Sequence, residues 1–146
     1  MLRRSIVQAL ALSAVLAMPA WAQATVPVAL KGYDPVAYFT DGKPTPGLAD
    51  YELTFDGQRY RFASAMHREL FKANPDKYAP QFGGLCAMNL SNGVKRESDP
   101  HSWVISNGNL YVFAGERGMQ NFTKAPEAYT SKADTNWKTL KTTATQ

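Results

Sequence analysis

Two short stretches of the chain carry the pattern of a tight β-hairpin, and this pattern limits the fold more than any other sequence feature. Residues 51–55 and 59–62 alternate apolar and polar side chains on either side of Asp56-Gly57. Residues 103–105 and 110–113 flank a second such dipeptide, Asn107-Gly108. Both dipeptides tolerate the positive φ angles that a two-residue turn requires. We therefore predict a small antiparallel sheet built from two hairpins.

Helix signals follow each hairpin. Ser64 is a good N-cap for a helix over residues 65–73, and Pro75 can begin a further turn of helix. The pattern of residues 119–140 predicts one or two helices broken near Pro126. No internal repeat is predicted. Together these elements indicate one α+β domain in which short helices cover the sheet.

The N-terminus has the three parts of a secretory signal peptide. Arg3-Arg4 precede an apolar run over residues 6–18, and Ala20-Trp21-Ala22 forms an Ala-x-Ala cleavage site. The apolar run is shorter than the roughly 20 residues of a membrane-spanning helix. We expect cleavage after Ala22, or else after Ala24. The mature domain, residues 23–146 with a core at about 26–141, is then periplasmic or secreted.

Charge and cysteine content narrow the classes of partner. The formal charge of +4 falls to +2 once Arg3 and Arg4 are removed, and the basic residues are scattered. We therefore expect no nucleic-acid partner, and no membrane contact after signal cleavage. Cys86 is the single cysteine, so no intramolecular disulfide can form. A lone thiol in an oxidising compartment is buried, bound to metal or available to another molecule.

A series of motifs runs along the mature chain. They are Gly32-Tyr33-Asp34-Pro35-Val36-Ala37-Tyr38-Phe39, Tyr60-Arg61-Phe62-Ala63-Ser64, His67, Phe71, Asn74-Pro75, Tyr78, Pro80-Gln81-Phe82-Gly83-Gly84-Leu85-Cys86-Ala87 and Ala133-Asp134-x-Asn136-Trp137. Together they resemble the YHS domain, and in particular its longer, exported subfamily. The resemblance implies a treble-clef-like core and a link to metals, because short YHS domains occur beside copper-transporting ATPases. Metal-associated forms carry cysteine at three positions that here hold Ala37, Ala63 and His67.

A soft-metal site is the first functional hypothesis. Cys86 and Met88 are two residues apart, and on a strand such residues point to the same face. We interpret the apolar segment 85–90 as extended, which would direct the thiol and the thioether toward one ion. Both are soft ligands that favour copper(I). His67, on the predicted helix after Ser64, is the candidate third ligand.

Other interpretations use the same residues differently. Tyr33, Asp34 and Tyr38 could form an aromatic-walled small-ligand pocket with Gly83 and Gly84, where glycine lets a ligand approach the backbone. Asp34 either caps the helix that follows it or orients His67. Cys86 is either buried in a metal-free interaction module or paired with His67 as a reactive thiol. Because no catalytic triad or paired carboxylates stand out, a binding protein is favoured over an enzyme.

Overall fold

The computed structural model describes residues 25–143; the predicted signal peptide, residues 1–22, lies outside this range. Its elements, in chain order, are the 3-10 turn η2 (Ala29–Gly32), α1 (Ala37–Thr40), β1 (Leu48–Phe55), β2 (Gln58–Phe62), α2 (Ala65–Ala73), α3 (Pro75–Tyr78), the 3-10 turn η3 (Gln81–Gly84), α4 (Ala87–Ser91), β3 (Asp99–Ser106), β4 (Asn109–Phe113), α5 (Glu116–Lys124) and α6 (Pro126–Thr143). The predicted α+β class is confirmed. No helix within the described range is long and apolar enough to cross a membrane.

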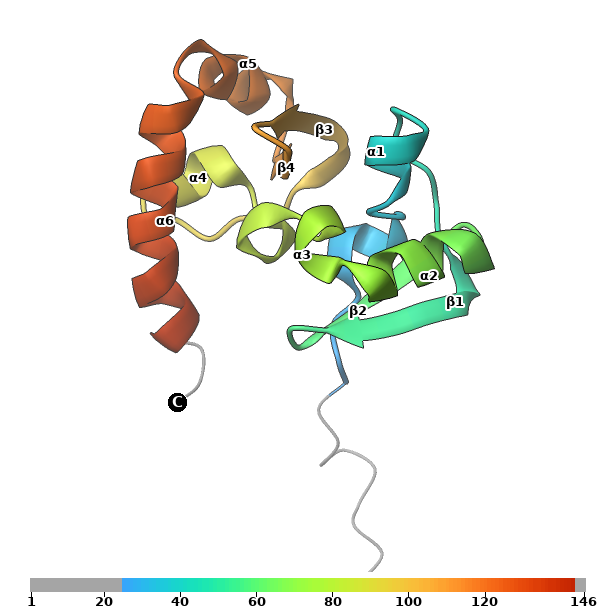
Figure 1. Cartoon of the computed structure of the whole chain (residues 1–146). Helices are drawn as coiled ribbons and strands as arrows, with labels where there is room; N and C mark the ends of the chain where they lie inside the picture. Colours follow the sequence, from blue (N-terminus) through green and yellow to red (C-terminus); the bar gives the residue numbers. More distant parts are fainter. Residues whose placement is uncertain (1–24, 144–146) are drawn as a thin grey trace, which may run out of the picture.

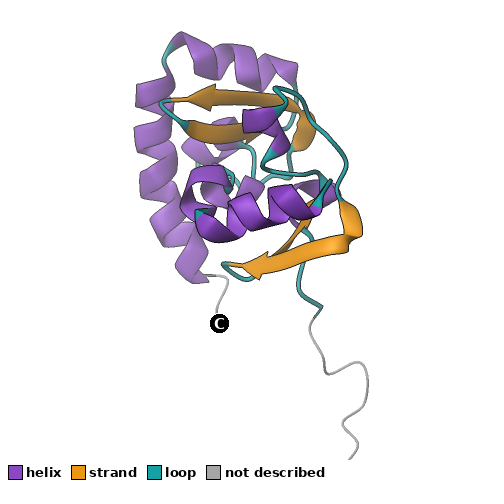
Figure 2. Cartoon of the chain, turned by 45° about the vertical axis from the view of Figure 1, so that its right-hand side comes forward, coloured by secondary structure: helices purple, strands orange, loops and turns teal. Residues whose placement is uncertain are grey.

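Both predicted hairpins are present, but they do not share a sheet. β1 pairs with β2, and β3 with β4, in two separate antiparallel sheets. Each turn uses the predicted dipeptide, with Asp56 and Asn107 at φ angles of 45° and 50°. The prediction of one sheet is therefore wrong. Each hairpin packs against the helices that follow it, as Figures 1 and 2 show for β1–β2 under α2 and for β3–β4 beside α5.

The order of elements repeats along the chain. A turn, a short helix, a hairpin and two helices occur first as η2 to α3 and again as η3 to α6. The registers agree residue for residue: Leu48 pairs with Phe62, and Asp99 with Phe113, each 51 positions later, with an irregularity at the same place. The expectation of no internal repeat is wrong. We call residues 29–78 the first repeat and residues 81–143 the second.

The two repeats share their core residues. Identical residues 51 positions apart are Tyr60 and Tyr111, Phe62 and Phe113, Ala63 and Ala114, Phe71 and Phe122, Pro75 and Pro126, and Tyr78 and Tyr129. Their packing matches as well. The Phe62 and Phe71 ring centroids lie 5.2 Å apart, and those of Phe113 and Phe122 lie 5.1 Å apart. Each repeat thus builds its own aromatic core around the phenylalanine of its first long helix.

Most helix predictions hold, with one exception. Ser64 Oγ accepts a hydrogen bond from the His67 N–H and begins α2, and the chain breaks between α5 and α6 at Pro126. The apolar segment 85–90, interpreted as extended, instead contains most of α4. Tertiary packing explains the difference: Leu90 is fully buried, and Asn136 Nδ2 of α6 donates to its carbonyl oxygen at 2.9 Å.

A third apolar cluster joins the repeats. Leu30 and Tyr38 of the first repeat pack with Leu110 and Val112 of β4 in the second. The Tyr38 hydroxyl also donates to the Pro100 carbonyl oxygen at 2.9 Å. The turn and helix that open the first repeat are therefore anchored on the second hairpin, as their position below and beside β3–β4 in Figure 1 indicates.

Candidate functional site

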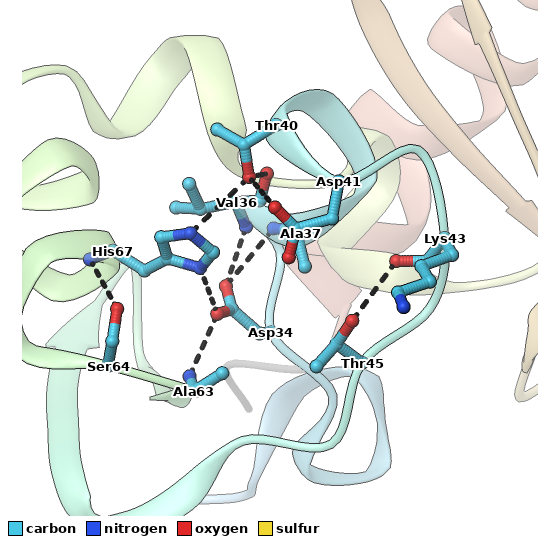
Figure 3. Close-up of polar contacts among 10 residues, drawn as sticks. All are labelled: Asp34, Val36, Ala37, Thr40, Asp41, Lys43, Thr45, Ala63, Ser64 and His67. Atoms are coloured by element: carbon cyan, nitrogen blue, oxygen red, sulfur yellow. Dashed lines mark hydrogen bonds and ion pairs between the residues drawn. The ribbon is translucent and has the colours of Figure 1, made fainter.

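Asp34 is a fully buried carboxylate that holds three segments of the first repeat together. Its Oδ1 accepts from the N–H of Val36 at 2.8 Å and of Ala37 at 3.4 Å, so it supports the start of α1. Its Oδ2 accepts from the Ala63 N–H at 2.8 Å and from His67 Nδ1 at 2.6 Å. The two roles weighed for Asp34, cap and histidine partner, are thus filled by its two oxygens (Figure 3).

His67 is held by Asp34 with one nitrogen turned toward Thr40. Because a carboxylate only accepts, Nδ1 carries the donated proton. The Thr40 hydroxyl lies 3.4 Å from Nε2 but only 2.9 Å from Asp41 Oδ1, and it has a single proton to donate. When that proton goes to Asp41, no other donor among residues 25–143 lies close to the Nε2 lone pair of a neutral imidazole. Figure 3 shows this nitrogen facing α1, opposite Asp34.

The three positions where metal-associated YHS domains carry cysteine all meet at Asp34. Ala37 and Ala63 contact it through their backbone N–H groups, and His67 through its ring. The three positions thus lie around one carboxylate, but two of them carry methyl groups, which cannot bind a metal. A thiolate-ligated metal does not fit this donor set. Hydrogen bonds to a carboxylate link the three positions instead.

The second repeat has a corresponding position, and Cys86 occupies it. The turns η2 and η3 share a left-handed pair, Leu30-Lys31 and Phe82-Gly83, with φ angles between 50° and 62°. In each repeat the residue after the turn donates back into it. The next N–H, that of Asp34 or of Cys86, donates to a carbonyl oxygen just before the following strand, at 2.8 and 2.9 Å respectively. By these hydrogen bonds Cys86 is the counterpart of Asp34, one residue beyond the 51-residue spacing of the hairpins.

The counterpart of His67 is Gly118, and a hollow of about 340 Å³ opens beside it. Cys86 and Met88 line this hollow, together with Ala114, the counterpart of Ala63. A Cβ added to Gly118 would lie 3.5 Å from Met88 Cβ, in ordinary contact. Because Gly118 has no side chain where the first repeat has His67, space remains beside Cys86 and Met88.

The structure brings some predicted ligands together and separates others. Cys86 and Met88 line one hollow, although they lie at the N-cap and in the first turn of α4 rather than on a strand, and Cys86 is buried. His67 is not part of that lining, and its partners are Asp34, Ser64 and Thr40 in the other repeat. A Cys86–His67 pair is therefore not formed. Among residues 25–143, no three His, Cys, Asp or Glu side chains converge as a metal site.

The predicted aromatic pocket is also divided. Gly83 and Gly84 line a hollow of about 160 Å³ whose lining does not include Tyr33, Asp34 or Tyr38. Tyr33 packs edge-on against His101, with ring centroids 5.3 Å apart. Tyr38 is buried in the joint between the repeats, and burial raises the pKa of its hydroxyl well above the usual range.

Sequence reasoning missed Gly118 and Thr40 as parts of these sites. The signal for Gly118 was the 51-residue spacing of the shared core residues, which aligns His67 with it. Thr40 carries no such signal, because its contact with His67 depends on how α1 packs against α2.

Comparison with known proteins supports the resemblance over part of the chain. The YHS domain family matches residues 36–82, a segment that contains Ala37, Ala63 and His67 and covers most of the first repeat. No curated protein and no solved structure gave a match. The matched segment ends at residue 82, so Cys86 and its hollow lie outside it.

Proposed function

We propose that this chain is an exported YHS-type binding protein that takes up a soft metal ion, copper(I) in the first place, at the hollow of the second repeat. One observation carries the proposal: Met88 and Cys86, the latter buried in the core of the second repeat, line the same hollow. This pair of donors is soft and favours copper(I) over magnesium or calcium. His67, one of the three ligands suggested by the sequence, is left out because it belongs to the other repeat.

The charges around the hollow favour a monovalent ion. Arg96, Arg117 and Glu116 line it beside Cys86, so its surroundings carry a net positive charge. A divalent ion would meet repulsion there. Copper(I) bound in exchange for the thiol proton leaves the charge of the site unchanged, and this exchange avoids that cost.

Native mass spectrometry under anaerobic conditions tests the proposal, with copper(I) and zinc offered separately. The expected result is one copper(I) ion per chain, lost in Cys86→Ser and weakened in Met88→Leu. His67→Ala is the matched control and should retain the ion. Absence of a copper(I) adduct on the unaltered protein, while a copper carrier in the same solution loads, would overturn the proposal. Loss of the adduct in His67→Ala alone would move the site to the first repeat.

A second candidate function, a metal-free binding module, is favoured by the state of His67. Asp34 holds the ring through Nδ1, and within the described part of the chain Nε2 has only the 3.4 Å contact to the Thr40 hydroxyl. A partner that donates a hydrogen bond could engage this nitrogen. The chain has two histidines, so ring-nitrogen NMR spectra can compare His67 directly with the exposed His101. Binding that perturbs Nε2 of His67 in Cys86→Ser as in the unaltered protein would favour this candidate.

Export is part of the proposal and has its own test. The pattern of residues 1–22 supports cleavage by a signal peptidase. Intact-mass analysis of protein recovered from the periplasm or the medium should give a chain beginning at Gln23, or at Thr25 for the alternative site. Recovery only of the uncleaved chain, inside the cell, would contradict it.

A further inference from the structure

A further hollow, of about 570 Å³, lies where the last turns of α6 meet the tip of the first hairpin. It plays no part in the proposed metal site. Four aromatic residues contribute to its walls: Phe55 of β1, Tyr60 of β2, Phe82 of η3 and Trp137 of α6. The planes of the Phe82 and Trp137 rings are inclined at 70°, with centroids 6.4 Å apart, so the two rings pack edge to face. We call this the hairpin–helix hollow.

The charged residues that line the hairpin–helix hollow are both acidic. Asp56 and Asp76 line it with exposed carboxylates, and none of its lining residues is lysine, arginine or histidine. Tyr60 adds no charge at neutral pH, because burial and then Asp56 raise the pKa of its hydroxyl to about 12. Aromatic faces beside carboxylates attract cations, and most strongly those that carry apolar groups.

The chain already places one of its own cations at the rim of this hollow. Lys141 Nζ lies 2.9 Å from Asp56 Oδ2 and 5.7 Å from the centroid of the Trp137 ring. An alkylammonium group is thus held by a carboxylate and an aromatic face at once. Lys141 is about half exposed, so a ligand can displace it.

The second repeat contains a matching hollow with a different lining. Residues 51 positions after Phe55 and Asp56 are Ser106 and Asn107, which line a polar hollow of about 480 Å³ beside Tyr111. That hollow also has the carboxylates of Glu127 and Asp134, but Lys138 lies beside them and Tyr111 is the single aromatic residue of its lining. The hairpin–helix hollow therefore differs in its four aromatic residues and in having no cationic residue in its lining.

From these observations we propose that the hairpin–helix hollow binds a small quaternary ammonium compound. The methylated cation lies against Trp137 and the neighbouring rings, and Asp56 and Asp76 balance its charge. A quaternary ammonium has no N–H to donate, which suits walls that offer aromatic faces rather than many hydrogen-bond acceptors. The site does not depend on metal binding at Cys86.

Choline is the probe. The matched control ligand is 3,3-dimethyl-1-butanol, in which an uncharged carbon replaces the quaternary nitrogen of choline. Binding is followed by NMR of the indole N–H of Trp137, with Trp103 as the internal reference, at constant ionic strength. Choline should shift the Trp137 signal in a saturable way and dimethylbutanol should not. Equal responses to the two compounds, or no response of Trp137 to choline, would overturn the proposal.

Exposed charges provide variants that leave the core intact. Asp56→Asn and Asp76→Asn should each weaken choline binding by about three- to tenfold. Lys141→Met removes the competing internal ammonium and should tighten binding by about two- to fivefold. Asp134→Asn, on α6 at the hollow of the second repeat, is the matched control and should change nothing. Tighter binding in Asp56→Asn, or weaker binding in Lys141→Met, would contradict the assigned site.

Discussion

At the scale of single residues, Asp34 carries the largest share of the polar interactions in the first repeat. It accepts from three backbone N–H groups and from His67 while fully buried. The carboxylate stabilises the fold because it pairs these buried N–H groups. Each of them would bear its full desolvation cost if it lost its acceptor. Asp34 therefore links the start of α1, the end of β2 and α2.

Replacing this carboxylate gives the first prediction. Asp34→Asn puts an amide nitrogen, which cannot accept, in place of one oxygen, and it leaves at least one buried N–H group unpaired. We expect the free energy of unfolding to fall by about 2–4 kcal/mol, in the range for breaking a buried charged network. Urea denaturation followed by circular dichroism measures this. Asp41→Asn, at an exposed position nearby, is the control, and equal small losses in both variants would contradict the role given to Asp34.

The buried tyrosines predict a stability loss in alkali. The pKa of Tyr60 rises from 10.0 to about 12 in the fold, with burial as the largest cause and the Asp56 carboxylate next. A raised pKa means that folding favours the neutral phenol. The contribution of the neutral Tyr60 phenol to the free energy of unfolding is complete below pH 10. It is lost as the pH rises from 10 to 12, at about 1.4 kcal/mol per pH unit for one group.

Tyr60→Phe isolates that contribution. Urea unfolding between pH 9 and 12 should show a shallower loss of stability in the variant than in the unaltered protein. Tyr38 titrates as a background in both, since burial also raises its pKa. Parallel losses in the two proteins would show that ionisation of Tyr60 is not coupled to folding.

At the scale of elements, local chemistry predicts those segments whose ends carry their own signals. Asp56-Gly57 and Asn107-Gly108 define the hairpins, and Ser64 and Pro75 define where α2 and α3 begin. α4 has no such signal. An apolar run of that length suits a strand or a buried helix equally. Its conformation depends on packing against α6, including the hydrogen bond from Asn136.

Gly118 and Gly57 show how an element's backbone determines the effect of the same substitution. Gly118 lies inside α5, and an added Cβ meets Met88 only at ordinary contact distance. Gly118→Ala should raise the free energy of unfolding by about 0.5–1 kcal/mol, because glycine is the weaker helix former.

Gly57 provides the opposite case. It has open space around its Cα but a φ of +75°, which disfavours any side chain. Gly57→Ala should lower stability by about 1 kcal/mol. Thermal or urea unfolding of both variants checks the pair, and a destabilised Gly118→Ala would mean that the hollow beside Cys86 is more tightly closed than its geometry indicates.

At the scale of the whole molecule, the repeated order of elements explains why residues predicted to share a site lie in different repeats. The repeats keep the aromatic core that makes the fold, and they differ where a site would form. Asp34 corresponds to Cys86, and His67 to Gly118. Because the sequence was interpreted as a single domain, His67 and Cys86 were assigned to one site. The structure places them in equivalent regions of the two repeats: one holds the Asp34–His67 pair, and in the other a hollow lies beside the buried Cys86.

The joint between the repeats gives the last prediction. Leu110 is fully buried where β4 packs against Leu30 and Tyr38 of the other repeat. Leu110→Ala leaves a cavity there and should cost about 2–5 kcal/mol. If the repeats fold as one unit, hydrogen exchange should speed up by the same factor in β2 and in β4. Leu53→Ala, in the first-repeat cluster alone, is the control for a change outside the joint. Faster exchange confined to β4 in Leu110→Ala would mean that each repeat unfolds separately, and that the first repeat retains its Asp34–His67 pair without support from the second.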